Sequence, residues 1–177
     1  MEIIFAVVIS IGSIMLAAWM IYTVLSLAPW LPTRSTDYER IGVAAQIQKG
    51  DVFYDLGSGD GRVICALAQK CPDAQFVGIE MSFLLHVIAC MRMALVGVTN
   101  VRCIRGNIFT QSYAGASIIY IFGTDRTINS QRMKDLLDGL PSQTRVILYN
   151  FTYAAWAESR IVHEKKGNTT LNIYHTK

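Results

Sequence analysis

The pattern of hydrophobic and polar positions separates an N-terminal segment from the rest of the chain. Residues 3–28 are predominantly apolar, and no Asp, Glu, Lys or Arg occurs between Glu2 and Arg34. A membrane-spanning helix needs roughly 20 such residues, so we predict a transmembrane anchor over residues 1–30. A signal peptide, which would carry a positive n-region and a shorter apolar core, and a buried core helix remain the alternatives.

The charges that flank this segment predict its orientation. Arg34 and Arg40 follow it, whereas only Glu2 precedes it. Basic residues are enriched on the cytoplasmic side of a span. We therefore expect a single-pass protein that has the membrane as a partner and residues 34–177 in the cytoplasm.

We assign a connector and a first helix to residues 31–50. After them, strand patterns and helical patterns alternate along the chain. Apolar runs of strand length cover residues 52–56, 75–81, 101–104, 117–122 and 145–151. Helical patterns cover residues 38–48, 62–70, 83–96 and 128–140. Two further runs flank the turn-forming residues 165–168 and predict a hairpin. The alternation predicts an α/β fold for residues 51–177, with a Rossmann-like, doubly wound, mostly parallel sheet that ends in an antiparallel hairpin.

Composition narrows the classes of partner. Of the 177 residues, 52% are hydrophobic, and the net charge of +3 is too small to indicate a nucleic-acid-binding surface. The four cysteines form no C-x-x-C pair and have no His at a metal-ligand spacing. We expect reduced thiols, no metal and no nucleic acid.

The candidate chemistry is concentrated in the turn after the first predicted strand. The run Asp55-Leu-Gly-Ser-Gly-Asp-Gly61 joins that strand to a helical pattern. Glycines there can take positive φ and let the backbone approach a ligand, and ligands of doubly wound sheets bind at this edge. We predict that the cofactor contacts Asp55, Gly57, Ser58, Gly59, Asp60 and Gly61.

The spacing of the glycines favours S-adenosylmethionine (SAM) over a dinucleotide. The dinucleotide fingerprint G-x-G-x-x-G would need glycine at Arg62, whereas the third glycine is Gly61. Asp60 would also place a carboxylate beside a pyrophosphate. The acidic groups of Asp55 and Asp60 suit the cationic methionine end of SAM.

Two further positions complete the predicted cofactor site. Glu80 ends the second strand about 20 residues after the turn, where a carboxylate can accept hydrogen bonds from a ribose diol. Asn107, after the third strand, is a candidate for the adenine, with Met81 or Ile108 against its face. A solvent-facing Glu and a plain loop Asn are the alternatives.

These residues resemble the class I SAM-dependent methyltransferases. Asp55 to Gly61 looks like the first motif of that superfamily, and Val77-Gly-Ile-Glu80 looks like its acidic second motif. Asn107 stands where many members carry Asp. The N-terminal apolar segment, the Pro-Thr connector and Ile121-Phe122-Gly123 are similar to the membrane-anchored protein-lysine methyltransferases of the ATP synthase c-subunit and adenine nucleotide translocase type and their prokaryotic relatives. That resemblance implies a protein-lysine substrate and a segment from Pro32 to Tyr38 that closes over the SAM pocket.

The acceptor channel is predicted from the end of the fourth strand, which abuts the cofactor site in this architecture. Its candidate residues are Tyr38, Phe122, Gly123, Thr124 and Asp125. Asp125 would attract an ammonium group or begin the next helix. No catalytic base is evident, and a lysine acceptor can lose its proton to water before transfer.

Four functions are compatible with these observations. The main hypothesis is a membrane-anchored methyltransferase that acts on a lysine of a protein in or near the membrane. The alternatives are a methyltransferase for a lipid, a quinone or another small molecule, a non-catalytic SAM-binding membrane module, and a dinucleotide oxidoreductase. The last is disfavoured by Asp60 and Arg62.

Overall fold

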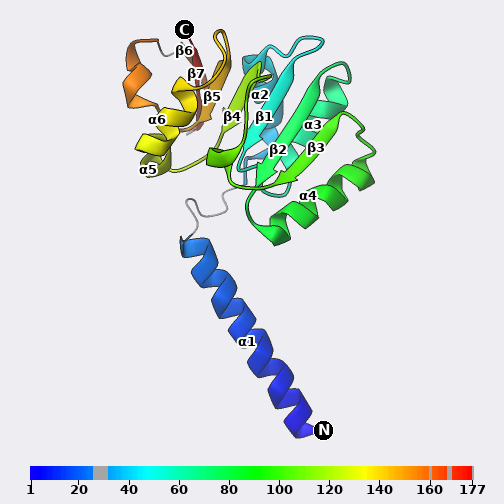
Figure 1. Ribbon diagram of the computed structural model, residues 1–177. Helices are drawn as coiled ribbons and strands as arrows, with labels where there is room; N and C mark the ends of the chain where they lie inside the picture. Colours follow the sequence, from blue (N-terminus) through cyan, green and yellow to red (C-terminus); the bar gives the residue numbers. More distant parts are fainter. Residues whose placement is uncertain (26–31, 160, 167–168, 177) are drawn as a thin grey trace. The chain divides into compact units, whose positions relative to one another are not determined.

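The computed structural model describes residues 1–25, 32–159, 161–166 and 169–176. The chain divides into two compact units, residues 1–31 and residues 32–177. The first unit is a helix and the second carries all of the sheet (Figure 1). The two units are described separately below.

The first unit contains the helix α1 (Glu2–Leu25). Its window Ile3–Met20 has a mean hydropathy of 2.4 and no buried residue. By length and composition α1 can cross a membrane, although an N-terminal signal sequence meets the same criteria. The helix therefore establishes an apolar segment of membrane-spanning length.

The second unit is built on a seven-stranded sheet with the order β3-β2-β1-β4-β5-β7-β6. Its strands are β1 (Val52–Leu56), β2 (Gln75–Glu80), β3 (Val101–Arg105), β4 (Ile118–Ile121), β5 (Arg145–Tyr149), β6 (Ile161–Lys166) and β7 (Thr169–His175). The strands β1 to β5 are parallel to one another, whereas β7 runs antiparallel to both β5 and β6. The Rossmann-like sheet and the terminal hairpin are confirmed.

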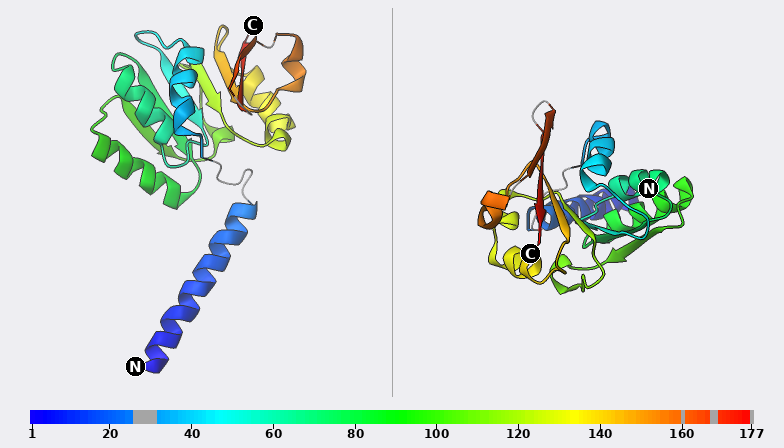
Figure 2. Two further views of the ribbon diagram at one scale, coloured as in Figure 1. Left: turned by 180° about the vertical axis from the view of Figure 1, so that it is seen from behind. Right: turned by 90° about the horizontal axis from the view of Figure 1, so that it is seen from above.

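Helices cover both faces of this sheet (Figure 2). One face packs against α2 (Tyr38–Ala45) and α3 (Arg62–Lys70), with α4 (Phe83–Val96) beside α3 and β3 at the sheet edge. The other face packs against α5 (Asp125–Ile128), α6 (Gln131–Asp138) and the short 3-10 helices η2 (Ile108–Thr110) and η3 (Ala154–Ser159). A third 3-10 helix, η1 (Ser35–Asp37), precedes α2.

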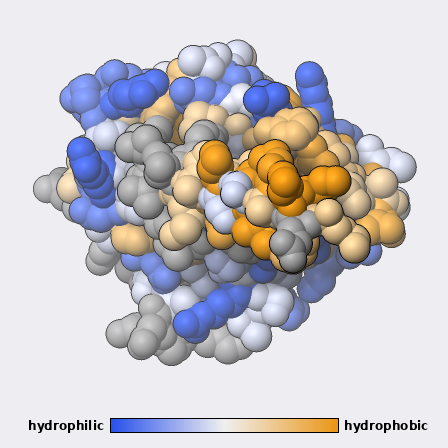
Figure 3. Space-filling view, turned by 90° about the horizontal axis from the view of Figure 1, so that it is seen from below, coloured by the Kyte–Doolittle hydropathy of each residue, from blue (hydrophilic) through white to orange (hydrophobic). Residues whose placement is uncertain are grey.

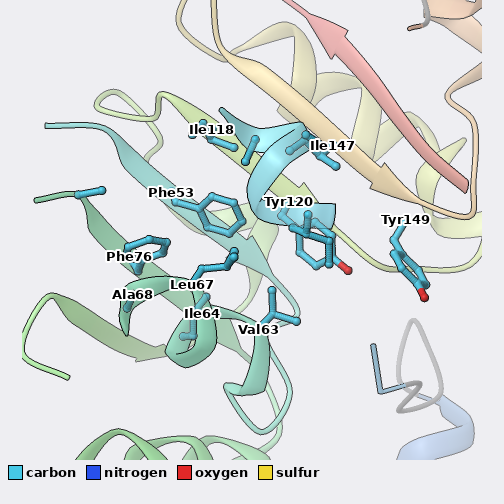
Figure 4. Packing of buried hydrophobic residues seen from close by; sticks show 14 of the residues in the cluster. Phe53, Val63, Ile64, Leu67, Ala68, Phe76, Ile118, Tyr120, Ile147 and Tyr149 are labelled. Atoms are coloured by element: carbon cyan, nitrogen blue, oxygen red, sulfur yellow. The ribbon is translucent and has the colours of Figure 1, made fainter. Parts of the chain in front are cut away.

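The core follows from the alternation of side chains along each buried strand. Phe53 on β1, Phe76 on β2 and Leu67 on α3 point toward one another on one face (Figure 4). On β4, Ile118 and Tyr120 belong to this cluster, whereas Ile119 and Ile121 belong to the cluster on the opposite face. Successive strand residues point to opposite faces, so a parallel strand covered on both sides is apolar throughout.

The structure corrects two helix boundaries. The helix predicted over residues 128–140 begins only at Gln131, as α6, because the Ser130 side chain accepts a hydrogen bond from the Met133 N–H and caps it, while Ile128 is the last residue of the separate helix α5. The helix predicted over residues 38–48 ends at Ala45, since Gln46 is left-handed with φ 45°. Both interruptions are local events inside a continuous apolar periodicity.

Candidate functional site

The predicted cofactor residues all lie at one edge of the sheet. Asp55 pairs with Gly78 on β2 and with Tyr120 on β4, so the turn after β1 lies between the carboxyl ends of both neighbours. Strand order reverses at β1, since β2 lies on one side and β4 on the other. This is the topological switch point where doubly wound folds bind ligands.

The glycines of this turn have separate structural reasons. Gly57, Gly59 and Gly61 have φ values of 82°, 56° and 72°, which side-chain-bearing residues rarely adopt. A Cβ on Gly57 would meet no atom within 4 Å, so this glycine faces open space, as a ligand-facing backbone must. A Cβ on Gly61 would lie 3.0 Å from the Ala89 Cβ, so this glycine lets α4 pack against the turn.

Glu80 connects the turn to the start of α4. Its Oε2 accepts a hydrogen bond from the Gly59 N–H at 2.9 Å, and its Oε1 accepts one from the Ser82 N–H at 2.7 Å. Each carboxylate oxygen can accept a second bond. The carboxylate is therefore oriented by the backbone and retains acceptor capacity, as binding a ribose diol requires.

Asp60 does not offer an unpaired charge to a ligand, contrary to the expectation from the sequence. Arg62 binds its two oxygens at 2.8 and 2.7 Å, and Arg92 on α4 binds it at 2.8 Å. Burial would raise the pKa of Asp60, but the two guanidinium groups outweigh it and lower the pKa. Arg92 Nε also donates to the Asp60 carbonyl at 2.9 Å, so Asp60 holds the turn against α4.

Asp55 is the acidic group of the turn that has no hydrogen-bond donor among the described residues. Its exposed fraction is 3%. Burial, followed by the negative charges of Glu80 and Asp60, raises its pKa to about 8. A cationic ligand group beside Asp55 would relieve this cost, which is the arrangement that the methionine ammonium of SAM requires.

Ser58 contributes to the site through its backbone. Its N–H donates to the Ile79 carbonyl at 3.0 Å. Its Oγ is buried without a partner in the described residues, and a Cβ on Gly78 would come within 2.8 Å of it. The hydroxyl therefore points beneath the turn toward β2.

The adenine candidates lie at the ends of β2 and β3. Asn107 Oδ1 accepts a hydrogen bond from the Phe109 N–H at 3.0 Å and caps η2. Its amide nitrogen donates to no described residue, so it remains available. Met81 is 40% exposed and Ile108 is half-buried. The ligand contacts of these three residues stay predictions.

The segment before α2 packs against the carboxyl ends of β4 and β5. The hydroxyls of Thr33 and Tyr120 are 3.0 Å apart. The Tyr149 hydroxyl donates to Asp37 Oδ2 at 2.6 Å, and Arg40 donates to Asp37 Oδ1 at 2.8 Å. These buried contacts bring residues 33–40 to the edge of the sheet that carries the glycine turn.

Tyr38 reaches the turn itself. Burial raises its pKa, and the nearby Arg62 guanidinium, the partner of Asp60, partly offsets this shift. The side chain is half-buried. The structure thus brings Tyr38 to the glycine turn, which is compatible with the predicted place beside the reacting groups.

The end of β4 is arranged differently from the expectation. Thr124, not Asp125, caps α5, because its Oγ1 accepts from the Thr127 N–H at 3.3 Å. Asp125 is exposed, and its Oδ1 accepts a hydrogen bond from Asn129 at 2.9 Å. Phe122 packs its ring 4.7 Å from that of Tyr149, and Gly123 is buried. Asp125 therefore presents a negative charge to solvent after β4.

Sequence reasoning missed several residues that hold the site together. These are Arg92, Tyr120, Tyr149 and Thr169. Arg92 lies 32 positions from Asp60, and Tyr149 lies 112 positions from Asp37. Arg40 Nη1 also donates to Thr169 Oγ1 at 2.9 Å, which ties the network to β7. No local spacing in the sequence indicates such pairs. The one available indication was a polar residue at a position expected to be buried.

Comparisons with known proteins agree with this geometry. Residues 55–160 match the family described as ANTKMT methyltransferase domain. A protein-lysine N-methyltransferase of Saccharolobus islandicus (strain REY15A) is 26% identical over 147 residues, which are 82% of this chain and 91% of that protein.

Solved structures show the same fold with a product of methyl transfer. An RNA methyltransferase from Salinibacter ruber in complex with S-adenosyl-L-homocysteine is 27% identical, with a TM-score of 0.74 over 82% of this chain and 93% of its own. A SAM-dependent methyltransferase from Geobacter sulfurreducens, in complex with the same compound, is 24% identical with a TM-score of 0.58 and shares the fold. It covers 67% of this chain and 49% of its own.

The residues at the switch point fit SAM. Asp55 is a buried carboxyl with no donor in the described part of the chain, Gly57 faces open space, and Glu80 keeps acceptor capacity. The family match begins at Asp55 and spans the glycine turn, Glu80 and the residues that follow β4. The chain belongs to the ANTKMT methyltransferase domain family and is a SAM-dependent methyltransferase.

Proposed function

We propose that this enzyme is anchored in a membrane by α1 and methylates lysine side chains of a protein in or near that membrane. The observation that carries the lysine assignment is the similarity to the Saccharolobus islandicus protein-lysine N-methyltransferase over 91% of that protein's length. The membership of the ANTKMT methyltransferase domain family agrees with it.

The acceptor side of the site supports an amine substrate. Asp125 exposes a carboxylate after β4, and Tyr38 with Phe122 supplies aromatic surface nearer the turn. A carboxylate attracts a lysine ammonium group, and aromatic side chains stabilise cations. These groups would position a lysine without protonating or deprotonating it.

The chemistry needs little beyond positioning. SAM supplies an electrophilic methyl group on a sulfonium centre. The lysine must arrive as a neutral amine, and its proton can leave to water beforehand. The chain's own part is to hold the acceptor in line and to exclude water, and such positioning is a major source of rate acceleration.

The anchoring rests on the first unit. α1 has 24 residues, and its most apolar window has a mean hydropathy of 2.4. The positive charges of Arg34 and Arg40 after the span favour a cytoplasmic domain. A tether raises the effective concentration of the enzyme at membrane-embedded substrates.

The acceptor is tested by supplying three substrate classes to the full chain in liposomes. Radiolabelled SAM is added with membrane proteins, total RNA or a lipid extract from the source cells. We expect label in protein, recovered as methyl-lysine after hydrolysis, and none with the Gly59→Arg variant. Label confined to RNA would favour the activity named for the Salinibacter ruber relative, and label confined to lipid would favour a small-molecule methyltransferase.

Anchoring is tested separately by alkaline extraction of membranes that contain the full chain. An integral membrane protein stays in the pellet, whereas a peripheral one is released. We expect the chain in the pellet at its full length. Release into the supernatant, or a product shortened at the N-terminus, would overturn the anchor and leave the methyltransferase activity untouched.

A further inference from the structure

Helix α4 carries an exposed hydrophobic surface that the catalytic site does not use. Leu84, Ile88, Met91 and Leu95 repeat every three or four residues, so they lie on one face of the helix. Their exposed fractions are 51%, 37%, 60% and 85%, and that of the neighbouring Phe83 is 62%. We call these five residues the α4 face. Within α4, all of which is described, Ala89 is the one buried residue.

The apolar content of α4 is therefore not explained by the core of its own domain. Exposed apolar patches of this kind mark an interaction surface in a soluble domain. The hydrophobic surface seen from below in Figure 3 includes the apolar helix α1, so the α4 face is defined by the exposed fractions of its own residues. We therefore expect the α4 face to contact another apolar surface, either of a protein or of a membrane.

The charged residues of α4 and of the chain that follows it, up to Thr124, are all positive. No Asp or Glu occurs from Met81 to Thr124. Arg102 and Arg105 on the edge strand β3 are exposed, and the Arg105 guanidinium lies 5.1 Å from the centre of the Phe83 ring. The two acidic groups beside α4 are already engaged, since Asp60 is paired with Arg92 and the Glu80 carboxylate accepts hydrogen bonds from the Gly59 and Ser82 N–H groups. The face is thus apolar with a basic border.

A bilayer with anionic headgroups matches this combination. Interfacial helices bury aliphatic and aromatic side chains at the level of the headgroups, while flanking basic residues meet anionic lipids. A second copy in a two-fold dimer would bring Arg102 and Arg105 of both copies to the same interface, and no acidic residue between Met81 and Thr124 would balance them. Charge complementarity therefore favours lipid over a second copy.

The chain also limits how far this face can lie from the proposed anchor. The stretch from Leu25, the last residue of α1, to Thr33, which is fixed against Tyr120, reaches roughly 25–30 Å when fully extended. A domain held by such a short tether samples the headgroup region continually. Weak interfacial binding is then sufficient, because it is intramolecular.

We propose that the α4 face docks onto the headgroup region of an anionic bilayer, as a second membrane contact separate from α1. The inference rests on the proposed membrane anchoring and deepens it. Since α4 begins directly after Glu80 and Met81, docking sets the cofactor edge of the sheet close to the bilayer surface. Lysines just outside the hydrocarbon core would then be the accessible acceptors.

Methionine methyl NMR of the full chain in nanodiscs tests this directly. Met91 lies on the α4 face, Met133 is fully buried under the opposite sheet face, and Met15 lies in α1. In discs that contain anionic lipid and a nitroxide-labelled lipid, we expect the Met91 signal to lose more than half its intensity. The Met133 signal should keep its intensity, and the Met91 loss should be smaller in zwitterionic discs.

Matched variants separate the α4 face from a general effect of charge. Leu84→Glu combined with Leu95→Glu should restore the Met91 signal, whereas Val43→Glu on α2, where the exposed fraction is 58%, should not. An unchanged Met133 signal reports that each variant is folded.

Each adverse outcome has a distinct meaning. A full Met91 signal beside a quenched Met15 signal would overturn the α4 inference and leave the anchor intact. A full Met15 signal would overturn the anchor itself. A Met91 shift that depends on protein concentration, without nitroxide quenching, would assign the face to a second copy and overturn the proposal.

Discussion

Two buried carboxyl groups at the same edge of the sheet have opposite environments. Asp37, before α2, has an exposed fraction of 2% and accepts hydrogen bonds from Arg40 and Tyr149. Asp55, at the end of β1, has an exposed fraction of 3% and accepts none from the described residues. Burial raises the pKa of both, but the two donors lower that of Asp37 overall, whereas the pKa of Asp55 rises to about 8.

The difference separates a completed structural site from an incomplete binding site. A buried charge is stable only when paired and hydrogen-bonded. The Asp37 network is satisfied within the chain, so it fixes residues 33–40 over the sheet edge. Asp55 keeps a buried environment that is unfavourable for its charged form. Such an environment is characteristic of groups whose partner is a bound ligand. The predictions below test this division.

The largest effect is expected from Arg40→Ala. The variant leaves the Asp37 carboxylate buried without its guanidinium partner, with the Tyr149 and Thr169 hydroxyls beside it. Removing one partner of a buried pair costs about 3–5 kcal/mol in the free energy of unfolding. Chemical denaturation measures this loss, with Arg126→Ala, at an exposed position of α5, as control. Equal stability of the two variants would mean that the Asp37 network is not structural.

The second prediction concerns the pH dependence of stability. The folded Asp55 carboxyl keeps its proton up to about pH 8, whereas the unfolded one releases it near its ordinary pKa of 3.8. The folded state thus binds more protons between these values, and stability falls as pH rises through this window. Between pH 6 and 8 we expect wild type to lose about 2 kcal/mol relative to Asp55→Asn.

Denaturation of the two proteins at several pH values provides this measurement. The comparison between wild type and Asp55→Asn removes the contribution of all other titrating groups, which both share. Parallel pH profiles would show that Asp55 is ionised in the free enzyme. The contrast with Asp37 would then disappear.

The sequence predicts the parts of this site that depend on local order. The glycine turn and Glu80 follow from strand, turn and spacing within 26 residues of chain (55–80), and the structure places them together. The pairing of Asp60 with Arg92 and of Asp37 with Tyr149 depends on how distant elements pack, which no local pattern specifies. The break at Ser130 was missed because the apolar periodicity continues across it.

The α4 face shows a further limit of sequence reasoning. An apolar helix next to a predicted strand indicates a core helix, and α3 is one, with five buried residues. α4 has the same position relative to its strand, yet it lies at the edge of the sheet and buries Ala89. Whether a helix is buried depends on the order of the strands in the sheet. The local sequence pattern does not specify that order.

The third prediction tests whether Gly57 faces the ligand. Gly57 and Gly50 have φ values of 82° and 87°, and a Cβ at either would meet no atom within 4 Å. Alanine at either position should therefore cost a similar amount of stability, roughly 1–2 kcal/mol. Calorimetric titration with SAM should show an affinity loss of about tenfold or more for Gly57→Ala and little change for Gly50→Ala. Equal SAM affinity of the two variants would place the ligand elsewhere.

The smallest effect is a proton released on SAM binding. At pH 7 a carboxyl with a pKa of about 8 is mostly protonated, and an ammonium group placed beside it would favour the ionised form. Binding should then release most of one proton, and affinity should rise as pH approaches 8. Calorimetry in buffers of different ionisation enthalpy counts the protons, and Asp55→Asn should release none through this group. Wild type that releases no proton would instead mean that Asp55 stays neutral and donates to the ligand, as a hydrogen-bonding acid rather than a counter-charge.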